Sequence, residues 1–281
     1  MSGRCWKAVK MRHVFSHFSE FKENIYNKHL MLFLDYDGTL TPIVDKPQRA
    51  LLSKKTKQLL SDLTRQRDYT IVVITGRALK DIKRLVGIKG IIYVGNHGFE
   101  IEGPQIRFRS PVYSGFRKIL RELKPEILEQ VSRFKGVFLE DKGFSLSLHY
   151  RLAKRSLISE IKTAFEKSVM EYMLTHKVKT NSGKMVMEIR PPVPWDKGKA
   201  VLWLFARQKF ANKAVPLLPL YIGDDITDDD AFRALRNKGI GVYVGTPKES
   251  YARFYVRNTK EVLRLFQELL RLKEGDTQCR N

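Results

Sequence analysis

The chain has 281 residues, of which 43% are hydrophobic and 29% charged, a composition that is ordinary for a soluble globular protein. Its 52 Lys and Arg residues against 30 Asp and Glu residues give a net charge of +22, which favours anionic partners such as phosphorylated metabolites, nucleic acid or anionic membrane. The sequence has no apolar run of membrane-spanning length, no apolar stretch typical of a secretory signal and no paired-cysteine motif, so we expect a cytoplasmic protein without a membrane partner.

The first third of the chain alternates apolar runs with amphipathic segments. Residues 1–28 are basic with scattered aromatic side chains, and we expect an arm or an opening helix there. The run HLMLFL then predicts a strand that stops at Asp35, LLSKKTKQLLSDLTRQ a helix, YTIVVI a strand that ends at Thr75, and ALKDIKRLV a second helix. A third strand is predicted in IIYVGNHGFEIEG. This alternation indicates a parallel sheet covered by helices on both faces.

The same pattern returns in the last third of the chain. VPWDKGKAVLWLFARQ and TDDDAFRALRN predict helices, PLYIGDD and GIGVYVG predict strands, and EVLRLFQELLRL predicts a closing helix. Residues 29–107 and 187–281 are therefore predicted to form one Rossmann-like α/β core.

Residues 108–186 differ, because apolar and polar side chains alternate there along the predicted strands. In FSLSLHYR the aromatic and leucine side chains point one way and the polar side chains the other. The charged residues that share the polar strand faces are Glu140, Lys142, Arg151, Lys184, Glu188 and Arg190. Helical patterns at about 115–133 and 153–173 are expected to cover the apolar side. These residues are predicted to form a small antiparallel sheet, inserted into the core as a second domain.

The segment Asp35-Tyr36-Asp37-Gly38-Thr39 lies at the carboxyl end of a predicted buried strand, where ligands of open α/β sheets bind. Two carboxylates this close repel each other unless a cation or a shared proton compensates, and Mg²⁺ suits them because it prefers hard oxygen ligands. Asp35 would then attack phosphorus, while Asp37 would protonate the leaving alkoxide and later activate water. Taken alone, the segment fits a simple turn at Asp37-Gly38 equally well.

A second acidic group follows the predicted strand PLYI. We expect Thr227 to cap the next helix, with Asp230 completing a variant capping box. That arrangement leaves Asp224 and Asp225 without a structural role. Asp224 is therefore predicted to be a third carboxylate ligand of the metal, with Asp225 and Asp228 supporting the ligands from behind.

Two further segments carry groups that suit a phosphoryl oxygen. Thr75 ends a predicted strand and precedes Gly76 and Arg77, so its hydroxyl and the adjacent N–H groups can bind phosphate; capping of the next helix explains Thr75 equally well. Lys197 follows Asp196, an expected N-cap, and therefore falls in the first turn of a helix, where a cation opposes the helix dipole. A lysine there would neutralise phosphate and aspartate charge together.

The order of these pieces resembles the haloacid dehalogenase superfamily of phosphohydrolases: strand–DxDGT, strand–TGR, DKG at a helix start, and strand–GDDxxD. Within it, FLDYDGTLTPIV, GNHGFE, LEDKGFSLSLHYR, MEIRPPVPWDKGKA and YIGDDITDDDAF resemble the trehalose-6-phosphate phosphatase family. The resemblance covers about residues 30–245. It implies a haloacid dehalogenase core with an inserted α/β cap, Mg²⁺ as cofactor, trehalose 6-phosphate as substrate and a trehalose-phosphate synthase as an expected partner.

The resemblance also implies a role for each residue. Asp35 would be the nucleophile, Asp37 the general acid/base, and Thr75 and Lys197 the pair that stabilises the phosphoryl group. The implied metal ligands are Asp35, Asp37 through its backbone carbonyl, and Asp224. The residues expected to bind substrate are Gly76, Arg77, His97, Glu140, Lys142, Arg151, Lys184 and Glu188. Without the resemblance, a solvated sheet face is the preferred interpretation of the last five.

Other functions remain open from the sequence. A capped phosphatase for sucrose phosphate or a glycosyl phosphoglycerate is a close alternative. A phosphomutase, which would convert one sugar phosphate isomer to another without releasing phosphate, is less favoured. A basic nucleic-acid-binding module is disfavoured because no recognition motif accompanies the charge of +22. A non-catalytic regulatory protein would have little need for all four catalytic elements.

Overall fold

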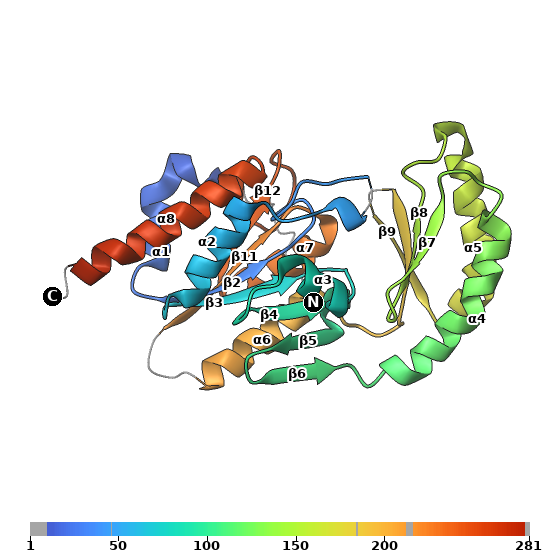
Figure 1. Cartoon of the computed structure of the whole chain (residues 1–281), viewed down its shortest axis with the longest axis horizontal. Helices are drawn as coiled ribbons and strands as arrows, with labels where there is room; N and C mark the ends of the chain where they lie inside the picture. The colour runs from blue at the N-terminus through green and yellow to red at the C-terminus, as the bar shows by residue number, and fades with distance from the viewer. Residues whose placement is uncertain (1–9, 46, 184, 212–215, 279–281) are drawn as a thin grey trace, which may run out of the picture.

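The computed structural model describes residues 10–45, 47–183, 185–211 and 216–278, and their strands form two separate sheets (Figure 1). The strands of the larger sheet are, in spatial order, β1 (Arg12–His13), β13 (Phe254–Val256), β12 (Ile240–Val244), β11 (Leu217–Gly223), β2 (His29–Leu34), β3 (Tyr69–Ile74), β4 (Ile92–Gly95), β5 (Glu100–Gly103) and β6 (Ile106–Arg109). Neighbouring strands from β1 to β4 run parallel, and β5 and β6 extend the sheet antiparallel. The predicted parallel sheet is thus confirmed.

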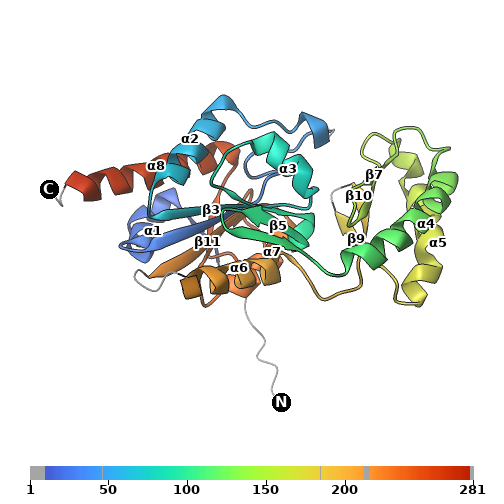
Figure 2. The same cartoon turned by 60° about the horizontal axis from the view of Figure 1, so that its bottom comes forward.

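Helices cover both faces of the larger sheet (Figures 1 and 2). On one face lie α1 (Phe18–Ile25), α2 (Lys54–Arg65), α3 (Leu79–Val86) and α8 (Thr259–Gln278), and on the other lie α6 (Lys197–Ala211) and α7 (Ile226–Leu235). Strand β2 is apolar from Leu30 to Leu34 because its two faces pack into different hydrophobic cores. Leu30, Leu32 and Leu34 belong to the first core, which lies between the sheet and helices α1, α2, α3 and α8. Met31 and Phe33 belong to the second core, which lies between the sheet and helices α6 and α7. None of the helices in the described part of the chain combines the length and the apolar character that a membrane crossing needs.

The described part of the predicted arm, residues 10–28, belongs to the core. Strand β1 pairs with β13 at the edge of the sheet, and α1 buries Phe21 and Ile25 in the first core. The alternative of an opening helix is therefore closer to the structure than a separate arm. Residues 1–9 lie outside the described residues.

The prediction of one strand in IIYVGNHGFEIEG is wrong. The segment divides into β4, a 3-10 turn η3 (Asn96–Gly98) and β5. Asn96, His97 and Gly98 all have positive φ angles of 50°, 55° and 106°, so the chain reverses there. As a result β5 pairs antiparallel with β4 instead of continuing it.

The smaller sheet, with its two helices, forms what we call the cap, residues 110–190. Its strands are β7 (Phe138–Asp141), β8 (Leu146–His149), β10 (Val186–Arg190) and β9 (Lys179–Gly183), all paired antiparallel. Helices α4 (Tyr113–Val131) and α5 (Ile158–Leu174) cover one face and enclose a third hydrophobic core. The other face is turned toward the larger sheet (Figure 1). Strand β10 continues to Arg190, beyond the predicted boundary at residue 186.

Candidate active site

Three parallel neighbours, β11, β2 and β3, end at the same edge of the larger sheet and bring the predicted chemical groups together. Asp35 follows β2, Thr75 follows β3 and Asp224 follows β11, and all three side chains are buried. Lys197 begins α6 and is also buried, with 3% of its surface exposed. The structure therefore places the four far-apart segments in one site.

Lys197 links the two acidic segments. Its Nζ donates to Oδ1 of Asp35 at 2.7 Å and to Oδ1 of Asp228 at 2.7 Å. Burial alone would lower the pKa of Lys197, but the carboxylates of Asp228 and Asp35 outweigh it and raise the pKa above its usual value. The two carboxylates therefore favour the charged form of the lysine.

Asp228 is fully buried and accepts four hydrogen bonds. Besides Lys197, its donors are the Tyr221 hydroxyl at 2.6 Å and the backbone N–H groups of Asp224 and Asp225, each at 2.9 Å. The predicted capping by Thr227 and Asp230 is wrong, because α7 begins at Ile226 with Asp225 as its N-cap and Asp228 in the capping box. The helix begins earlier than predicted because Lys197 and Tyr221 hold the Asp228 carboxylate on the inner side of its first turn.

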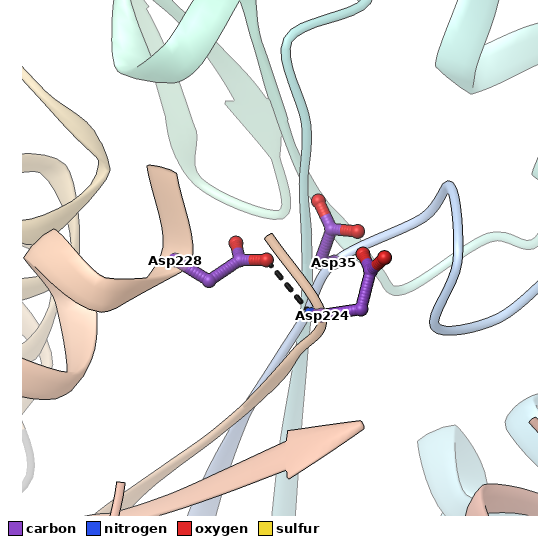
Figure 3. Close-up of side chains that lie close together, drawn as sticks. All are labelled: Asp35, Asp224 and Asp228. Carbon is purple, nitrogen blue, oxygen red and sulfur yellow. Dashed lines mark hydrogen bonds between the residues drawn. The ribbon is translucent and has the colours of Figure 1, made fainter. Parts of the chain in front are cut away.

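The carboxylates of Asp35, Asp224 and Asp228 offer oxygen atoms that all lie within 4.8 Å of one another (Figure 3). Burial and the neighbouring Asp228 raise the pKa of Asp35 well above its usual range, even though Lys197 opposes this. Three buried carboxylates against one lysine leave a deficit of positive charge, and a hard divalent cation would remove it. The residues present therefore fit such a cation. Since Asp228 is engaged by four donors, Asp35 and Asp224 are the better candidate ligands.

Arg77 holds the carboxylate of Asp37. Its Nε donates to Oδ2 at 2.6 Å and its Nη2 to Oδ1 at 2.5 Å, a two-pronged ion pair. The guanidinium also lies 5.3 Å from the centre of the Tyr36 ring. The Thr75 hydroxyl accepts from the Arg77 N–H at 3.2 Å, and α3 begins only at Leu79, so Thr75 is not the helix cap. Arg77 thus sets the direction of the Asp37 carboxylate.

A cavity of about 600 Å³ lies between this site and the polar face of the cap, a size typical of small-molecule sites. The predicted residues that line it are Asp35, Asp37, Thr75, Gly76, Arg77, His97, Glu140, Lys142, Arg151, Glu188, Lys197, Asp224 and Asp225. Asp228 lies behind this lining, and Lys184 lies outside the described residues. Core and cap therefore contribute to the walls of one cavity.

Glu188 is the centre of an ion network on the cap's polar face. It accepts from Ser145 at 2.9 Å, Lys142 at 3.2 Å, Ser147 at 3.3 Å and Nε of Arg190 at 2.6 Å. Burial would raise the pKa of Glu188, but Lys142, His97 and Arg190 hold it well below its usual range. Only 6% of Glu188 is exposed, so this part of the face is buried and hydrogen-bonded instead of solvated.

Three more cap side chains, Glu140, His149 and Arg151, line the cavity. The ring of His149 pairs with Glu140 at 2.8 Å. Nη1 of Arg151 donates to the backbone oxygen of Val44 at 3.1 Å, a contact that crosses from the cap to the core loop after β2. Glu140 and Arg151 both line the cavity, and the Arg151 contact connects its cap wall to the core.

Sequence reasoning missed two contributions to this site. Arg190 was placed on the polar face but given no role, although it is buried between Glu188 and His97. Strand β9, whose residues 180–183 line the cavity, was not predicted, because KTNSG has no apolar side chain to mark a period.

A family model described as trehalose-phosphatase matches residues 33–260. The chain belongs to the trehalose-phosphatase family. A relative from Arabidopsis thaliana, named probable trehalose-phosphate phosphatase D, is 34% identical over 272 residues, which cover 92% of this chain and 71% of that protein. The resemblance inferred from the motifs is thereby confirmed.

Solved structures similar to this chain have the same fold. The C-terminal domain of C. albicans trehalose-6-phosphate phosphatase matches with a TM-score of 0.78 at 24% identity and covers 94% of this chain and 99% of that one. A haloacid dehalogenase-like hydrolase from B. subtilis matches with a TM-score of 0.53 at 18% identity, over 85% and 99% of the two chains. The predicted haloacid dehalogenase fold with a cap is therefore confirmed, and the site residues fall inside the part matched by the trehalose-phosphatase model.

Acid is expected to destabilise this member of the trehalose-phosphatase family partly through His97. Burial and the nearby Arg190 lower the pKa of His97 to about 3, whereas in the unfolded chain it is about 6.5. Between these values the unfolded state binds more protons, so stability falls as the pH falls through that window. Replacing His97 by Gln should make the loss of unfolding free energy from pH 7 to pH 5 about 2 kcal/mol smaller. Denaturant titrations at both pH values measure this, and equal losses in the two proteins would contradict it.

Proposed function

We propose that the protein is a Mg²⁺-dependent phosphatase that hydrolyses trehalose 6-phosphate to trehalose and phosphate through an aspartyl phosphate on Asp35. One observation carries the proposal. Lys197 binds Asp35 beside Asp224 in a cavity whose opposite wall is a charged, hydrogen-bonded sheet face. Membership of the trehalose-phosphatase family supports the same reaction.

The chemistry assigned to the chain's own residues proceeds in two steps. A carboxylate oxygen of Asp35 forms a bond to phosphorus while the bond from phosphorus to the sugar oxygen breaks, and Asp37 gives its proton to the leaving alkoxide. Asp37 then takes a proton from water, whose oxygen attacks phosphorus and releases phosphate from Asp35. Lys197 orients the Asp35 carboxylate by binding Oδ1, and Thr75 and Lys197 stabilise the phosphoryl oxygens.

Asp35 and Asp224 are the side chains that would hold Mg²⁺, and Asp37 is expected to add its backbone carbonyl. When bound, the ion would neutralise charge on the carboxylates and on the phosphoryl group. Asp228 supports the ligands, since it fixes the backbone of Asp224 and the ammonium group of Lys197 together. Asp225 supports the same turn as the N-cap of α7.

The cap would recognise the sugar. Glu140, Lys142 and Glu188 are buried or partly buried polar groups on one wall, and a disaccharide presents many hydroxyls that can pair with them. Arg151 joins cap and core beside the cavity, and Gly76, Arg77 and His97 line it near the phosphoryl site. Lys184 stays a prediction from the sequence alone.

Two further proposals follow from the chemistry of the substrate. A trehalose-phosphate synthase would supply the phosphorylated sugar and is therefore a natural partner. A sugar phosphate is charged and does not cross membranes freely, so both enzymes would work in one compartment, which we propose to be the cytoplasm.

Phosphate release from a panel of sugar phosphates tests the proposed function. The purified protein should release phosphate from trehalose 6-phosphate faster than from sucrose phosphate or a glycosyl phosphoglycerate, because a sugar whose hydroxyls do not match a hydrogen-bonding site leaves the polar groups of that site unpaired. A chelator of divalent cations should stop the reaction, and added Mg²⁺ should restore it. Equal rates on the whole panel would contradict the choice of substrate. Turnover that survives chelation would contradict the metal.

A further inference from the structure

The loop of residues 96–99, between β4 and β5, is bound directly to the segment that follows β3. The N–H of Asn96 donates to the backbone oxygen of Arg77 at 2.7 Å, and the N–H of His97 donates to that of Thr75 at 2.9 Å. Asn96 and His97 have φ angles of 50° and 55°, which few residues other than glycine adopt. These two hydrogen bonds therefore hold the loop in its left-handed backbone conformation and couple its position to that of residues 75–77.

The His97 ring lies against Gly76 so closely that a Cβ on Gly76 would overlap the ring at Nε2 and Cε1. The same Nε2 contacts Nη2 of Arg190 and lies 3.2 Å from Oε2 of Glu188. The other ring nitrogen, Nδ1, is buried and has no hydrogen-bond partner among the residues that the structure describes. Every polar contact of this ring within the described chain therefore passes through Nε2.

The cap also contacts this loop on both sides of His97. Nδ2 of Asn96 donates to the backbone oxygen of Lys142 at 3.3 Å, and the ring of Phe99 stacks on that of Phe144 with centres 5.4 Å apart. The loop therefore touches the cap at three positions, Asn96, His97 and Phe99, and it binds the backbone of residues 75–77 through two hydrogen bonds. Through this loop, the ion network around Glu188 is connected to the backbone of residues 75–77.

We propose that His97 is a positioning residue that links the sugar-binding face of the cap to the backbone of residues 75–77. The link rests on the proposed function, in which the cap binds the sugar and Thr75 binds the phosphoryl group. A sugar hydroxyl that binds Glu188 or Arg190 fixes the position of the carboxylate or the guanidinium. These two groups in turn fix the position of the His97 ring. Because the ring has no free space above Gly76, it transmits that position to Thr75 and Arg77.

Two replacements of His97 separate this role from a merely structural one. Gln can place its terminal amide near the position of Nε2, whereas Asn reaches only as far as Nδ1. Asn also tolerates a positive φ, so His97→Asn should leave the loop backbone intact. For the best sugar phosphate of the panel, we expect His97→Asn to lower kcat on the order of tenfold with little change in KM, and His97→Gln to keep wild-type kcat within about twofold.

A phosphate ester that has no sugar, p-nitrophenyl phosphate, is the matched substrate. Since it cannot engage the cap network, its turnover should fall clearly less in His97→Asn than the turnover of the sugar phosphate does. Equal losses on both substrates, or equal losses in the Asn and Gln variants, would overturn the proposal. The double variant Arg190→Gln/His97→Asn supplies an independent measurement on the sugar phosphate. If the two residues are linked, its loss of kcat is smaller than the product of the losses in the two single variants. Fully multiplying losses would overturn the link, and melting temperatures check that each variant is folded.

The wild-type enzyme decides the proposed function separately from the link. If it prefers another sugar phosphate to trehalose 6-phosphate, the choice of substrate fails, while the comparison of the two His97 variants still decides the link on the preferred ester. If the wild-type enzyme hydrolyses the sugar phosphate and both variants match it, the function stands and the link fails.

Discussion

The Asp35→Asn protein is expected to fold and to release no measurable phosphate from trehalose 6-phosphate. An amide cannot form the acyl phosphate that a carboxylate oxygen forms, so turnover should fall by at least about 10⁴-fold. The fold should survive, because burial and the neighbouring Asp228 raise the pKa of Asp35 and thus already disfavour its charge in this place. We expect the melting temperature of the variant to equal or exceed that of the wild type. Phosphate release with Mg²⁺ present and a thermal melt measure both results.

A remote aspartate gives the control for this experiment. Asp81 on α3 pairs with Arg84 on the surface, so Asp81→Asn makes the same chemical change away from the cavity and should keep wild-type turnover. Turnover of Asp35→Asn within about tenfold of the control would remove Asp35 from the nucleophile role. A strongly lowered melting temperature would show that the Asp35 charge stabilises the fold, contrary to the repulsion described above.

The Lys197→Met protein should lose both stability and turnover. Methionine fills much of the lysine's space but leaves the buried carboxylates of Asp35 and Asp228 facing each other without the ammonium group between them. Removing one member of such a buried pair typically costs about 3–5 kcal/mol. Loss of a cation directed at the phosphoryl group should lower kcat by about 10²–10³-fold. Denaturant unfolding and steady-state kinetics measure the two effects.

Lys199, two residues further along α6, is the matched control because it is exposed. Lys199→Met should change the unfolding free energy by only about 0.5 kcal/mol and leave kcat near the wild-type value. If Lys197→Met unfolds at the same denaturant concentration as this control, the ion pairs with Asp35 and Asp228 do not stabilise the fold. If Lys197→Met is destabilised but keeps the wild-type kcat, Lys197 does not act on the phosphoryl group.

The core of the fold could be predicted because its signals are local. Strand β2 is apolar from Leu30 to Leu34 because both of its faces are buried, and the same holds for β3 from Ile71 to Ile74. The alternation in FSLSLHYR was equally direct. Leu146 and Leu148 do lie in the cap core, and Ser147 does face Glu188 on the polar side. In each case the period of the side chains follows from the strand itself.

The parts that could not be predicted depend on contacts between distant residues. Asp225 and Thr227 are both residue types that cap helices well. The hydrogen bonds from Lys197 and Tyr221 to Asp228 select Asp225, because they hold Asp228 in the first turn. The reversal at Asn96 and His97 was missed because neither is glycine, and the hydrogen bonds that hold the reversal come from residues 75–77. Two-residue strand β1 carries no period at all.

The double attachment of Asp228 limits how this enzyme can vary. The Asp228 carboxylate caps the first turn of α7 and also binds the ammonium group of Lys197 beside Asp35. The same carboxylate therefore serves the start of the helix and the proposed reaction. A longer acid would push Lys197 away from Asp35, and an amide would lose the charge that holds it. Substitutions at residues 197 and 228 are therefore expected to be epistatic, and a redesigned start of α7 has to be optimised together with the lysine.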